Sequence, residues 1–319
     1  GKQAGCAALL MAVQVGMYLE LMELLQDPEK EAKLSGFHRE KYLWLVVAWY
    51  IFNLKAILPE LVQAGVSSAG WLFRGHHLAS QGLGLTVLLR FVFALKMQDM
   101  LRYQLSQMAG LLLGLVLVVA QPAAALTSLR AGIFWFVLPA LLVIINDSGA
   151  YLAGCMFGKT PLLPKLSPKK TREGFVGALV MTVAAAIPLV SWLGGGSPGE
   201  LNWLTQPANI VPSQVAETVE ISALRLQAAE DLFRADSSLL GLPMCPAHWH
   251  AIGLALFASL VAPFGGFLAS AVKRAYGVKD FGDSIPGHGG LIDRLDCQLI
   301  MAGFVAAYIR TFFPTLVLH

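Results

Sequence analysis

Long apolar stretches alternate with short polar connectors along this sequence, which is the pattern of a protein that crosses a membrane several times. A bilayer core about 30 Å thick requires roughly 20 apolar residues per helix. Eight stretches approach this length: 5–26, 41–58, 78–95, 105–124, 131–153, 174–195, 249–271 and 297–313. The third is the weakest, because Arg90 interrupts it. The pattern therefore predicts an all-α, polytopic transmembrane helix bundle with about eight spans.

The composition agrees with this prediction and excludes other classes. Hydrophobic residues make up 56% of the 319 residues and charged residues only 13%, whereas an average soluble domain carries about 25% charged residues. Lipid must therefore be the solvent for much of the surface. The net charge of +3 is too small to indicate nucleic-acid binding. The four cysteines lie far apart, which indicates neither a disulfide framework nor a zinc site.

The distribution of Lys and Arg predicts the orientation, because the loops richer in these residues normally face the cytosol. The connectors near 27–41, 96–104, 159–173 and 272–296 hold fifteen basic residues, and those on the other side hold five. We therefore place the first set in the cytosol. This topology puts Gly1 on the other side, so we expect nine spans in the intact protein.

Several ionisable or polar residues fall inside the predicted spans. Asn146 and Asp147 lie in the fifth span, and an Asp at a helix centre costs about 2.5–3.5 kcal/mol on insertion scales. We expect Asp147 to face a polar cavity; the alternative is a helix that ends one turn earlier and leaves this carboxylate in water. For Glu20, Glu23 and Arg90, near span ends, snorkelling or an ion pair between helices is favoured over a place in the cavity.

The connector 159–173 combines cations, prolines and hydroxyl groups. Five basic residues beside a bilayer are by default a topology signal with a weak attraction to anionic lipid. The prolines stiffen the segment, which favours a polyphosphate or headgroup site slightly over that default. The candidate ligands are Lys165, Ser167, Lys169, Lys170 and Thr171.

The segment 270–296 is the densest group of charges, with four aspartates, four cations and one histidine. Asp293 and Asp296 are three residues apart, so on a helix that begins near Leu291 both carboxylates share one face. Such a pair suits Mg²⁺, which takes one or two carboxylates and completes its shell with water and substrate phosphates. Asp280 is a candidate third ligand. The alternative, a salt-bridged interfacial loop, is less favoured.

Glycines follow in the same segment. Gly289 and Gly290 permit a close approach of the backbone to a ligand, and His288 between the glycines is a candidate phosphate contact. Two spans separate the basic connector from this segment, so both lie on the same side. Cationic ligands, an acid cluster and the intramembrane Asp147 therefore meet at one mouth of the bundle, where lipid and a water-soluble reagent both have access.

Residues 270–296 resemble the diagnostic motif of the phosphatidate cytidylyltransferases (CDP-diacylglycerol synthases). That motif runs Ser, two residues, Lys-Arg, four residues, Lys-Asp, and ends Pro-x-His-Gly-Gly-x-x-Asp-Arg-x-Asp; every position is filled here. The segments around Asn146 and at 166–174 are similar to further family segments, and 257–266 is similar to the eukaryotic, endoplasmic-reticulum branch. The resemblance covers about 131–313 and is only compositional before that.

The resemblance implies a reaction of CTP with phosphatidic acid that gives CDP-diacylglycerol and pyrophosphate, by attack of the lipid phosphate on the CTP α-phosphate. Mg²⁺ is the expected cofactor, as one or two divalent ions, with a monovalent cation as an addition. The implied metal ligands are Asp147, Ser270, Asp280, Asp293 and Asp296. Catalytic roles are implied for Asp280, Asp293, Asp296, Lys279, Arg294 and His288. Substrate binding is implied for Asn146, Lys165, Ser167, Lys169, Lys170, Thr171, Lys273, Arg274, Gly289 and Gly290.

The same resemblance divides the chain into N-terminal transmembrane helices, 1–130, and a catalytic transmembrane region, 131–319. The second region holds the cytosolic loop 159–173, a non-cytosolic loop at 196–248 that we expect to be structural, and the motif 270–296. It implies an integral membrane enzyme of the endoplasmic reticulum whose active site faces the cytosol. The oligomeric state stays open, with a homodimer as one option, and so does the effect of Arg172, which replaces an expected Trp.

Two alternatives remain from the sequence. A CTP-dependent polyprenol kinase, such as a dolichol kinase, shares related features but transfers the γ-phosphoryl group and releases CDP. A transporter would also explain the intramembrane Asp147 and Arg90. It is less favoured because the sequence shows no internal repeat and the charged cluster lies at one interface.

Overall fold

The computed structural model describes most of the chain, with short gaps. The described residues are 2–34, 36–63, 69–95, 98–164, 166–194, 202, 204–207, 216–234, 237–239, 242–287 and 289–317.

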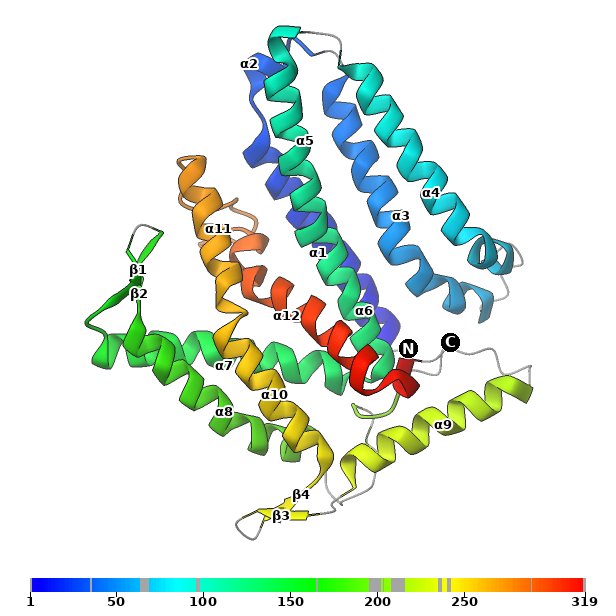
Figure 1. The fold of residues 1–319 in the computed structure, drawn as a ribbon, viewed down its shortest axis with the longest axis vertical. Helices are drawn as coiled ribbons and strands as arrows, with labels where there is room; N and C mark the ends of the chain where they lie inside the picture. The colour runs from blue at the N-terminus through cyan, green and yellow to red at the C-terminus, as the bar shows by residue number, and fades with distance from the viewer. Residues whose placement is uncertain are drawn as a thin grey trace.

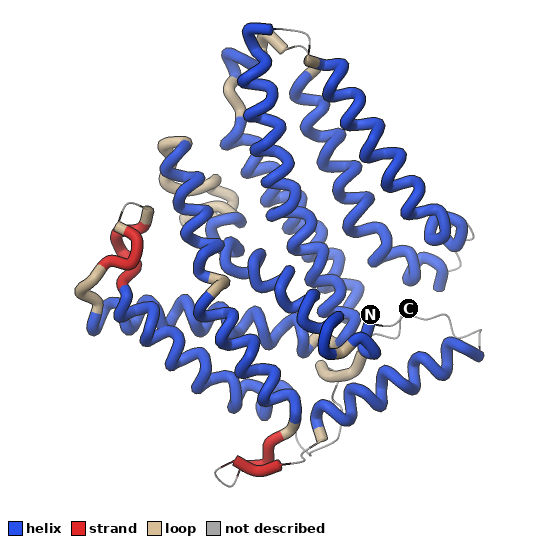
Figure 2. The backbone as a smooth tube through the Cα atoms, in the orientation of Figure 1, coloured by secondary structure: helices blue, strands red, loops and turns tan. Residues whose placement is uncertain are grey.

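Helices dominate these residues (Figures 1 and 2). In the N-terminal part they are α1 (Lys2–Leu25), α2 (Pro28–Glu31), α3 (Phe37–Gln63), α4 (Ala69–Ala94), η1 (Gln98–Met100), α5 (Leu101–Leu115), η2 (Val116–Ala120) and α6 (Gln121–Ala131). In the C-terminal part they are α7 (Phe134–Phe157), α8 (Arg172–Gly194), α9 (Ala216–Phe233), α10 (Pro246–Leu260), α11 (Pro263–Ala275), α12 (Leu291–Phe312) and η3 (Pro314–Val317). The all-α fold class is confirmed.

Two short antiparallel hairpins, red in Figure 2, join some of these helices. β1 (Pro161–Leu163) pairs with β2 (Ser167–Thr171), and β3 (Ser237–Leu239) pairs with β4 (Leu242–Met244). The first hairpin is formed by the proline-rich basic connector. The proline-rich connector, which the sequence predicts to be stiff, thus forms a small strand pair between α7 and α8.

The described residues contain seven helical segments that are long and apolar enough to cross a membrane: Gly5–Leu25, Arg74–Ala94, Leu101–Ala131, Phe134–Phe157, Arg172–Gly194, Pro246–Ala275 and Leu291–Phe312. The protein is a multi-pass integral membrane protein. Each of the seven overlaps one predicted span. The remaining predicted span, 41–58, lies within α3, some of whose side chains fall outside the described residues.

One predicted span is not a single helix. The stretch predicted as 249–271 is divided into α10 and α11, with Val261 and Ala262 between them. Pro263 explains the break, because proline has no N–H to donate and its ring clashes with the preceding turn. The break redirects the chain just before two glycines, Gly265 and Gly266, which pack against α12.

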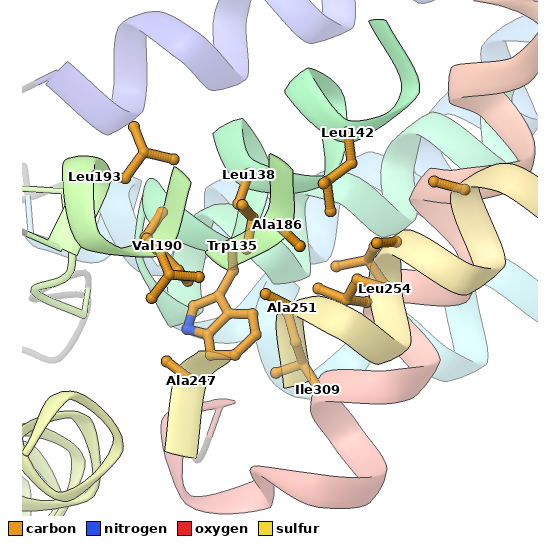
Figure 3. Packing of buried hydrophobic residues seen from close by; sticks show 14 of the residues in the cluster. Trp135, Leu138, Leu142, Ala186, Val190, Leu193, Ala247, Ala251, Leu254 and Ile309 are labelled. Atoms are coloured by element: carbon orange, nitrogen blue, oxygen red, sulfur yellow. The ribbon is translucent and has the colours of Figure 1, made fainter. Parts of the chain in front are cut away.

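Small residues allow the C-terminal helices to pack closely. Along α10, alanines recur every three or four residues and are almost completely buried: Ala247, Ala251, Ala255 and Ala258. In a membrane, where lipid is as apolar as the side chains, such small residues favour association by letting helices approach. Trp135 of α7 fills the space beside them and is 1% exposed, surrounded by α8, α10 and α12 (Figure 3).

A second apolar core joins the two predicted regions. It packs Met17 and Tyr18 of α1 and Leu111 of α5 against Ala269 of α11 and Ile292 of α12. The boundary at residue 130 stays a prediction, but helices from both sides of it share this core. The N-terminal helices therefore lie against the segment with the densest charge.

The long connector predicted as a non-cytosolic loop contains regular structure. Helix α9 packs Ala229, Leu232 and Phe233 into the apolar core that surrounds Trp135. Arg225 of α9 is buried and donates to the backbone oxygens of Leu316, at 3.0 Å, and Arg130, at 2.7 Å. Burial lowers the pKa of this guanidinium. Helix α9, in the described part of this connector, is thus a fixed part of the fold, and the structural role of the connector stays a prediction.

The arrangement of connectors agrees with the predicted alternation of sides. In Figure 1, the β1–β2 hairpin and the C-terminal end of α11 lie on the opposite side of the molecule from the N-terminus and α9. The basic connector and the segment 270–296 are therefore on a common side. Which side faces the cytosol stays a prediction.

Candidate active site

The basic hairpin is fastened to the helices on either side of it. The backbone N–H groups of Lys159 and Thr160 donate to the Glu173 carboxylate, each at 3.1 Å. The hydroxyl of Thr171 accepts from the N–H of Gly174 at 3.1 Å. Thr171, a predicted substrate ligand, is thus placed at the start of α8, where its Oγ1 supports the first turn.

The predicted ligands on the hairpin differ in where they lie. Lys169 is exposed, whereas Ser167 and Lys170 are half-buried. The Lys170 ammonium lies 4.7 Å from the centre of the Phe267 ring of α11, so it is directed toward the helices. Lys165 lies outside the described residues.

Lys170 reaches a place where α7, α11 and α12 meet, which we call the crossing. A Cβ atom built on Gly266 would lie 2.9 Å from Lys170 Nζ, 3.3 Å from Asp296 Oδ2 and 3.5 Å from Cys297 Sγ. A side chain at this position would enter the space between the lysine and the carboxylate, so the lysine would have to move. The Cys297 thiol in turn lies 4.0 Å from Asp147 Oδ1.

The crossing therefore brings together Asp147 from α7, Asp296 from α12 and Lys170 from β2. The two carboxylates and the ammonium are near enough to interact electrostatically. Among the described residues, no cation lies within 4.0 Å of either carboxylate, and Asp296 Oδ1 accepts from the N–H of Cys297 at 2.7 Å. Helix α7 continues to Phe157, so Asp147 is well inside a helix and not at its end.

A second group of acids lies where α11 turns back into α12, which we call the corner. Lys273 donates to Asp293 Oδ1 at 2.5 Å. Asp293 Oδ2 accepts from the N–H groups of Phe281 at 2.8 Å and Gly290 at 3.1 Å. Helix α12 begins at Leu291, as predicted. Asp293, at the third position of the helix, caps this end because its carboxylate accepts from the N–H of Gly290, the capping residue.

Gly289 joins Asp280 to this corner. Its φ of +80° is in the left-handed region, which glycine adopts without strain. A Cβ atom there would lie 3.3 Å from Asp293 Oδ2 and 3.4 Å from the Asp280 carboxyl carbon. The predicted acids are thus arranged as two pairs, Asp280 with Asp293 at the corner and Asp147 with Asp296 at the crossing.

The other predicted residues are distributed around these pairs. Ser270 donates to the Gly266 carbonyl at 2.7 Å, so its hydroxyl is engaged with α11. Lys279, Arg274 and Arg294 are exposed. The Asn146 side chain is buried, and its Oδ1 has no hydrogen-bond partner among the described residues. His288 lies outside the described residues.

The chemistry of these ligands fits Mg²⁺ that is completed by a substrate. No cluster of three or more Asp, Glu, His or Cys side chains that could enclose a metal occurs within the described parts of the chain. Mg²⁺ does not need such a cluster, because it is usually held by one or two carboxylates together with water and phosphate oxygens. Each acid pair supplies that number, and the oxygen of Asn146, next to Asp147 in the sequence, is a further hard donor with no partner among the described residues.

An apolar groove of about 200 Å³ reaches Asp296, one of the two carboxylates at the crossing. Its walls come from α1, α5, α11 and α12, and include Leu21, Leu113, Ala269 and Leu299. Asp296 is the one charged residue among the described residues that line it. The groove is smaller than the roughly 300–1,000 Å³ of common small-molecule sites, and its walls suit a hydrocarbon chain better than a nucleotide.

Comparisons with known proteins agree with this site. Residues 1–312 match the profile described as the Cytidylyltransferase family. The chain is 37% identical over 324 residues to phosphatidate cytidylyltransferase 3 of Arabidopsis thaliana, covering 96% of this chain and 65% of that protein. It is 35% identical over 317 residues to the phosphatidate cytidylyltransferase of Saccharomyces cerevisiae, covering 97% and 68%. The chain belongs to the phosphatidate cytidylyltransferase family.

Family membership confirms the resemblance seen in residues 270–296 and extends it. The match begins at residue 1, whereas the sequence alone showed only a similar composition before residue 131. A further relative, the phosphatidate cytidylyltransferase of Caenorhabditis elegans, is 39% identical over 318 residues, covering 95% of this chain and 66% of that protein. The chain thus spans about two thirds of the length of these relatives.

Sequence reasoning missed one residue of this region. Glu20 was expected to snorkel or to pair with a cation, but it is buried and accepts from backbone N–H groups of α12. Arg90 does form an ion pair between helices, with Glu40 of α3 at 2.5 Å. The only available signal for Glu20 was an acid within an apolar helix, and that signal does not reveal a partner 271 residues away.

Proposed function

We propose that the chain transfers the cytidylyl group of CTP to phosphatidic acid, giving CDP-diacylglycerol and pyrophosphate. The observation that carries the proposal is the crossing, where two carboxylates and Lys170 come together and Asp296 also lines an apolar groove, in a chain of this family. Such a place suits a substrate that has a phosphate at one end and hydrocarbon at the other. The names of the relatives point to the same substrate.

The lipid phosphate is the nucleophile in this proposal. A phosphate monoester has a second pKa of about 6 and is largely dianionic at neutral pH, so no strong general base is needed. One of its oxygens forms a bond to the α-phosphorus of CTP while the bond from that phosphorus to the bridging oxygen breaks. Pyrophosphate leaves with the electron pair of the broken bond, and CDP-diacylglycerol remains.

The protein must overcome the repulsion between two anions and hold them in line. Lys170, at the crossing, would bind the lipid phosphate, with the exposed Lys169, its neighbour on β2, as a further cation. Lys273, Lys279, Arg274 and Arg294 would neutralise CTP and the departing pyrophosphate. The main contribution of these residues is fixed positive charge at the phosphates.

The acid pairs would hold cations together with the nucleotide. Asp147 and Asp296, with the Asn146 oxygen nearby, would hold one, and Asp280 and Asp293 a second, with Ser270 beside the first. Bound Mg²⁺ would supply charge neutralisation to the phosphates of CTP. Lys273 pairs with Asp293, so this lysine would have to turn toward a phosphate for Asp280 and Asp293 to hold a cation.

The proposal includes a location and an orientation. The segment 257–266 is similar to the endoplasmic-reticulum branch of the family, and the basic connectors share a side of the molecule. We therefore place the protein in the endoplasmic reticulum with the crossing open to the cytosol, where CTP is present.

The direct test is to incubate the purified protein with CTP labelled in the cytosine ring, phosphatidic acid and Mg²⁺. The expected products are a labelled lipid and one pyrophosphate per lipid, and none should form when diacylglycerol replaces phosphatidic acid. Release of labelled CDP with a phosphorylated lipid would instead identify a CTP-dependent lipid kinase. Absence of any labelled lipid would contradict the proposal.

A further inference from the structure

Glu20 is an acidic residue in the apolar helix α1, and only 4% of it is exposed. A buried carboxylate is costly unless hydrogen bonds satisfy it. Glu20 receives them from the far end of the sequence: Oε1 accepts from the N–H of Leu291 at 2.7 Å, and Oε2 accepts from the N–H of Ile292 at 3.1 Å. Both oxygens are therefore committed to the first turn of α12.

The first N–H groups of any helix have no partner within the helix, and a neighbouring side chain usually accepts from them. In α12 this task is divided between two acids. Asp293 accepts from the N–H of Gly290 at 3.1 Å, and Glu20 takes the next two. A free helix N-terminus is a ready anion site, but this one is already occupied by carboxylates and is closed to a substrate phosphate.

Two glycines make room for the Glu20 carboxylate. A Cβ atom on Gly290 would lie 2.6 Å from Glu20 Oε2, and a Cβ atom on Gly282 would lie 3.2 Å from Glu20 Cγ. Gly282 belongs to the segment before α12 that also contains Phe281, whose N–H donates to Asp293. The Glu20 side chain thus lies between Gly282 and the start of α12.

We propose that Glu20 is a positioning residue for the transfer reaction, which connects the N-terminal helices to the acid pairs. It fixes the first turn of α12, from which Asp293 projects into the corner and Asp296, one turn later, into the crossing. This inference rests on the proposed function, because those acids are its cation ligands. It gives α1 a defined part in the active site although α1 carries none of the predicted ligands.

The test is Glu20→Gln, compared with Glu23→Gln as a matched control. Glu23 lies on the same helix, is exposed, and makes no side-chain hydrogen bond among the described residues. In Glu20→Gln the amide nitrogen would face a backbone N–H, so one of the two contacts is lost. Mutation of a residue that orients metal ligands typically lowers metal affinity or activity by about 10–100-fold. We therefore expect kcat to fall by about 10–100-fold and half-maximal activity to need more Mg²⁺. The KM for phosphatidic acid should change little, and Glu23→Gln should resemble the parent protein.

A second variant and a second measurement guard against simple unfolding. Gly282→Ala would push on Glu20 without removing it, and should lower kcat in the same direction by a smaller factor. Hydrogen exchange should show faster exchange at the amides of Leu291 and Ile292 in Glu20→Gln but not in Glu23→Gln. Glu20→Asp keeps the charge with a shorter reach, and should retain part of the activity that is lost in Glu20→Gln.

The inference is overturned if folded Glu20→Gln matches Glu23→Gln in kcat and Mg²⁺ requirement. It is also overturned if the loss of activity in Glu20→Gln only follows the loss of folded protein, or if exchange at the first turn of α12 is unchanged. A parent protein that makes no CDP-lipid would instead contradict the proposed function. In that case the exchange experiment would still decide whether Glu20 fixes this turn.

Discussion

Each of the two acid pairs of this protein has one member on α12, and the pairs differ in how their charge is balanced. At the corner, Lys273 pairs directly with Asp293, and two backbone N–H groups donate to the same carboxylate. At the crossing, Lys170 is near Asp296, but among the described residues no cation lies within 4.0 Å of Asp147 or Asp296. A direct ion pair within the described residues thus balances the negative charge of Asp293 at the corner, whereas no such ion pair balances the two carboxylates at the crossing.

This difference predicts that the two pairs contribute differently to stability and to turnover. A carboxylate within a membrane span is expensive unless it has a partner, so an unbalanced pair lowers stability when nothing is bound. A bound cation would remove that cost and bring CTP to the lipid phosphate. The crossing should therefore be needed for turnover and not for folding, whereas the corner should be needed for both.

The largest effect is expected from Asp296→Asn. Removing one cation ligand of the crossing should lower turnover by about 10²- to 10³-fold, as for other lost electrostatic contacts to a transition state. The midpoint of thermal unfolding in detergent should be unchanged or higher, because repulsion with Asp147 is relieved. Asp147→Asn should behave alike. Full Mg²⁺-dependent turnover in either variant would show that the crossing does not hold the cation.

Asp293→Asn should lower turnover by less, about 10–100-fold, but should also reduce stability. It removes the ion pair with Lys273, and hydrogen bonds to charged groups contribute about 1.5–3 kcal/mol. The free energy of unfolding is measured in a denaturant titration. Asp283→Asn, at an exposed aspartate of the same segment, is the control and should change neither quantity. If Asp293→Asn were inactive but as stable as the parent protein, the corner and the crossing would not differ in their contribution to stability.

Lys170→Met should raise the KM for phosphatidic acid by about tenfold, because a charge-assisted contact to its phosphate is worth about 1.5 kcal/mol or more. Lys159→Met, at an exposed lysine just before the hairpin, should leave the KM unchanged. Initial rates in mixed micelles at fixed CTP give both values. Equal KM values in the two variants would mean that Lys170 does not contact the lipid phosphate.

The smallest effect is expected from Gly266→Ala. Its methyl group would lie 2.9 Å from Lys170 Nζ and 3.3 Å from Asp296 Oδ2, so the lysine must move. A loss of about 1 kcal/mol in the contact of Lys170 with the lipid phosphate would lower kcat/KM roughly fivefold. Gly84→Ala, where nothing lies within 4 Å of the added atom, is the control. An effect of similar size in both variants would argue against close packing at the crossing.

The sequence predicted the helical class and most spans because each span carries its own apolar signal, which needs no information about its neighbours. It also predicted the start of α12 at Leu291. It did not predict the break at Val261 and Ala262, because a proline in an apolar run is compatible with a kinked or a continuous helix. Nor did it predict α9, whose connector is polar and whose core contacts depend on helices distant in the sequence.

The site was predicted as a set of residues but not as an arrangement. Spacing alone put Asp293 and Asp296 on one face and suggested one shared cation. The structure instead directs Asp293 to Lys273 and Asp296 toward Lys170, because α11 and the hairpin approach α12 from different directions. The parts that sequence could not supply, including Glu20 and Gly266, are those whose role depends on contacts between distant helices.

The central claim is that Asp296, with Asp147, holds a divalent cation together with CTP. Electron paramagnetic resonance of Mn²⁺, titrated into the purified protein with CTP present, measures this directly. The account predicts that Asp296→Asn weakens Mn²⁺ binding at least about tenfold, while its thermal unfolding stays at or above that of the parent protein. Mn²⁺ binding of equal affinity in folded Asp296→Asn and in the parent protein would contradict the account.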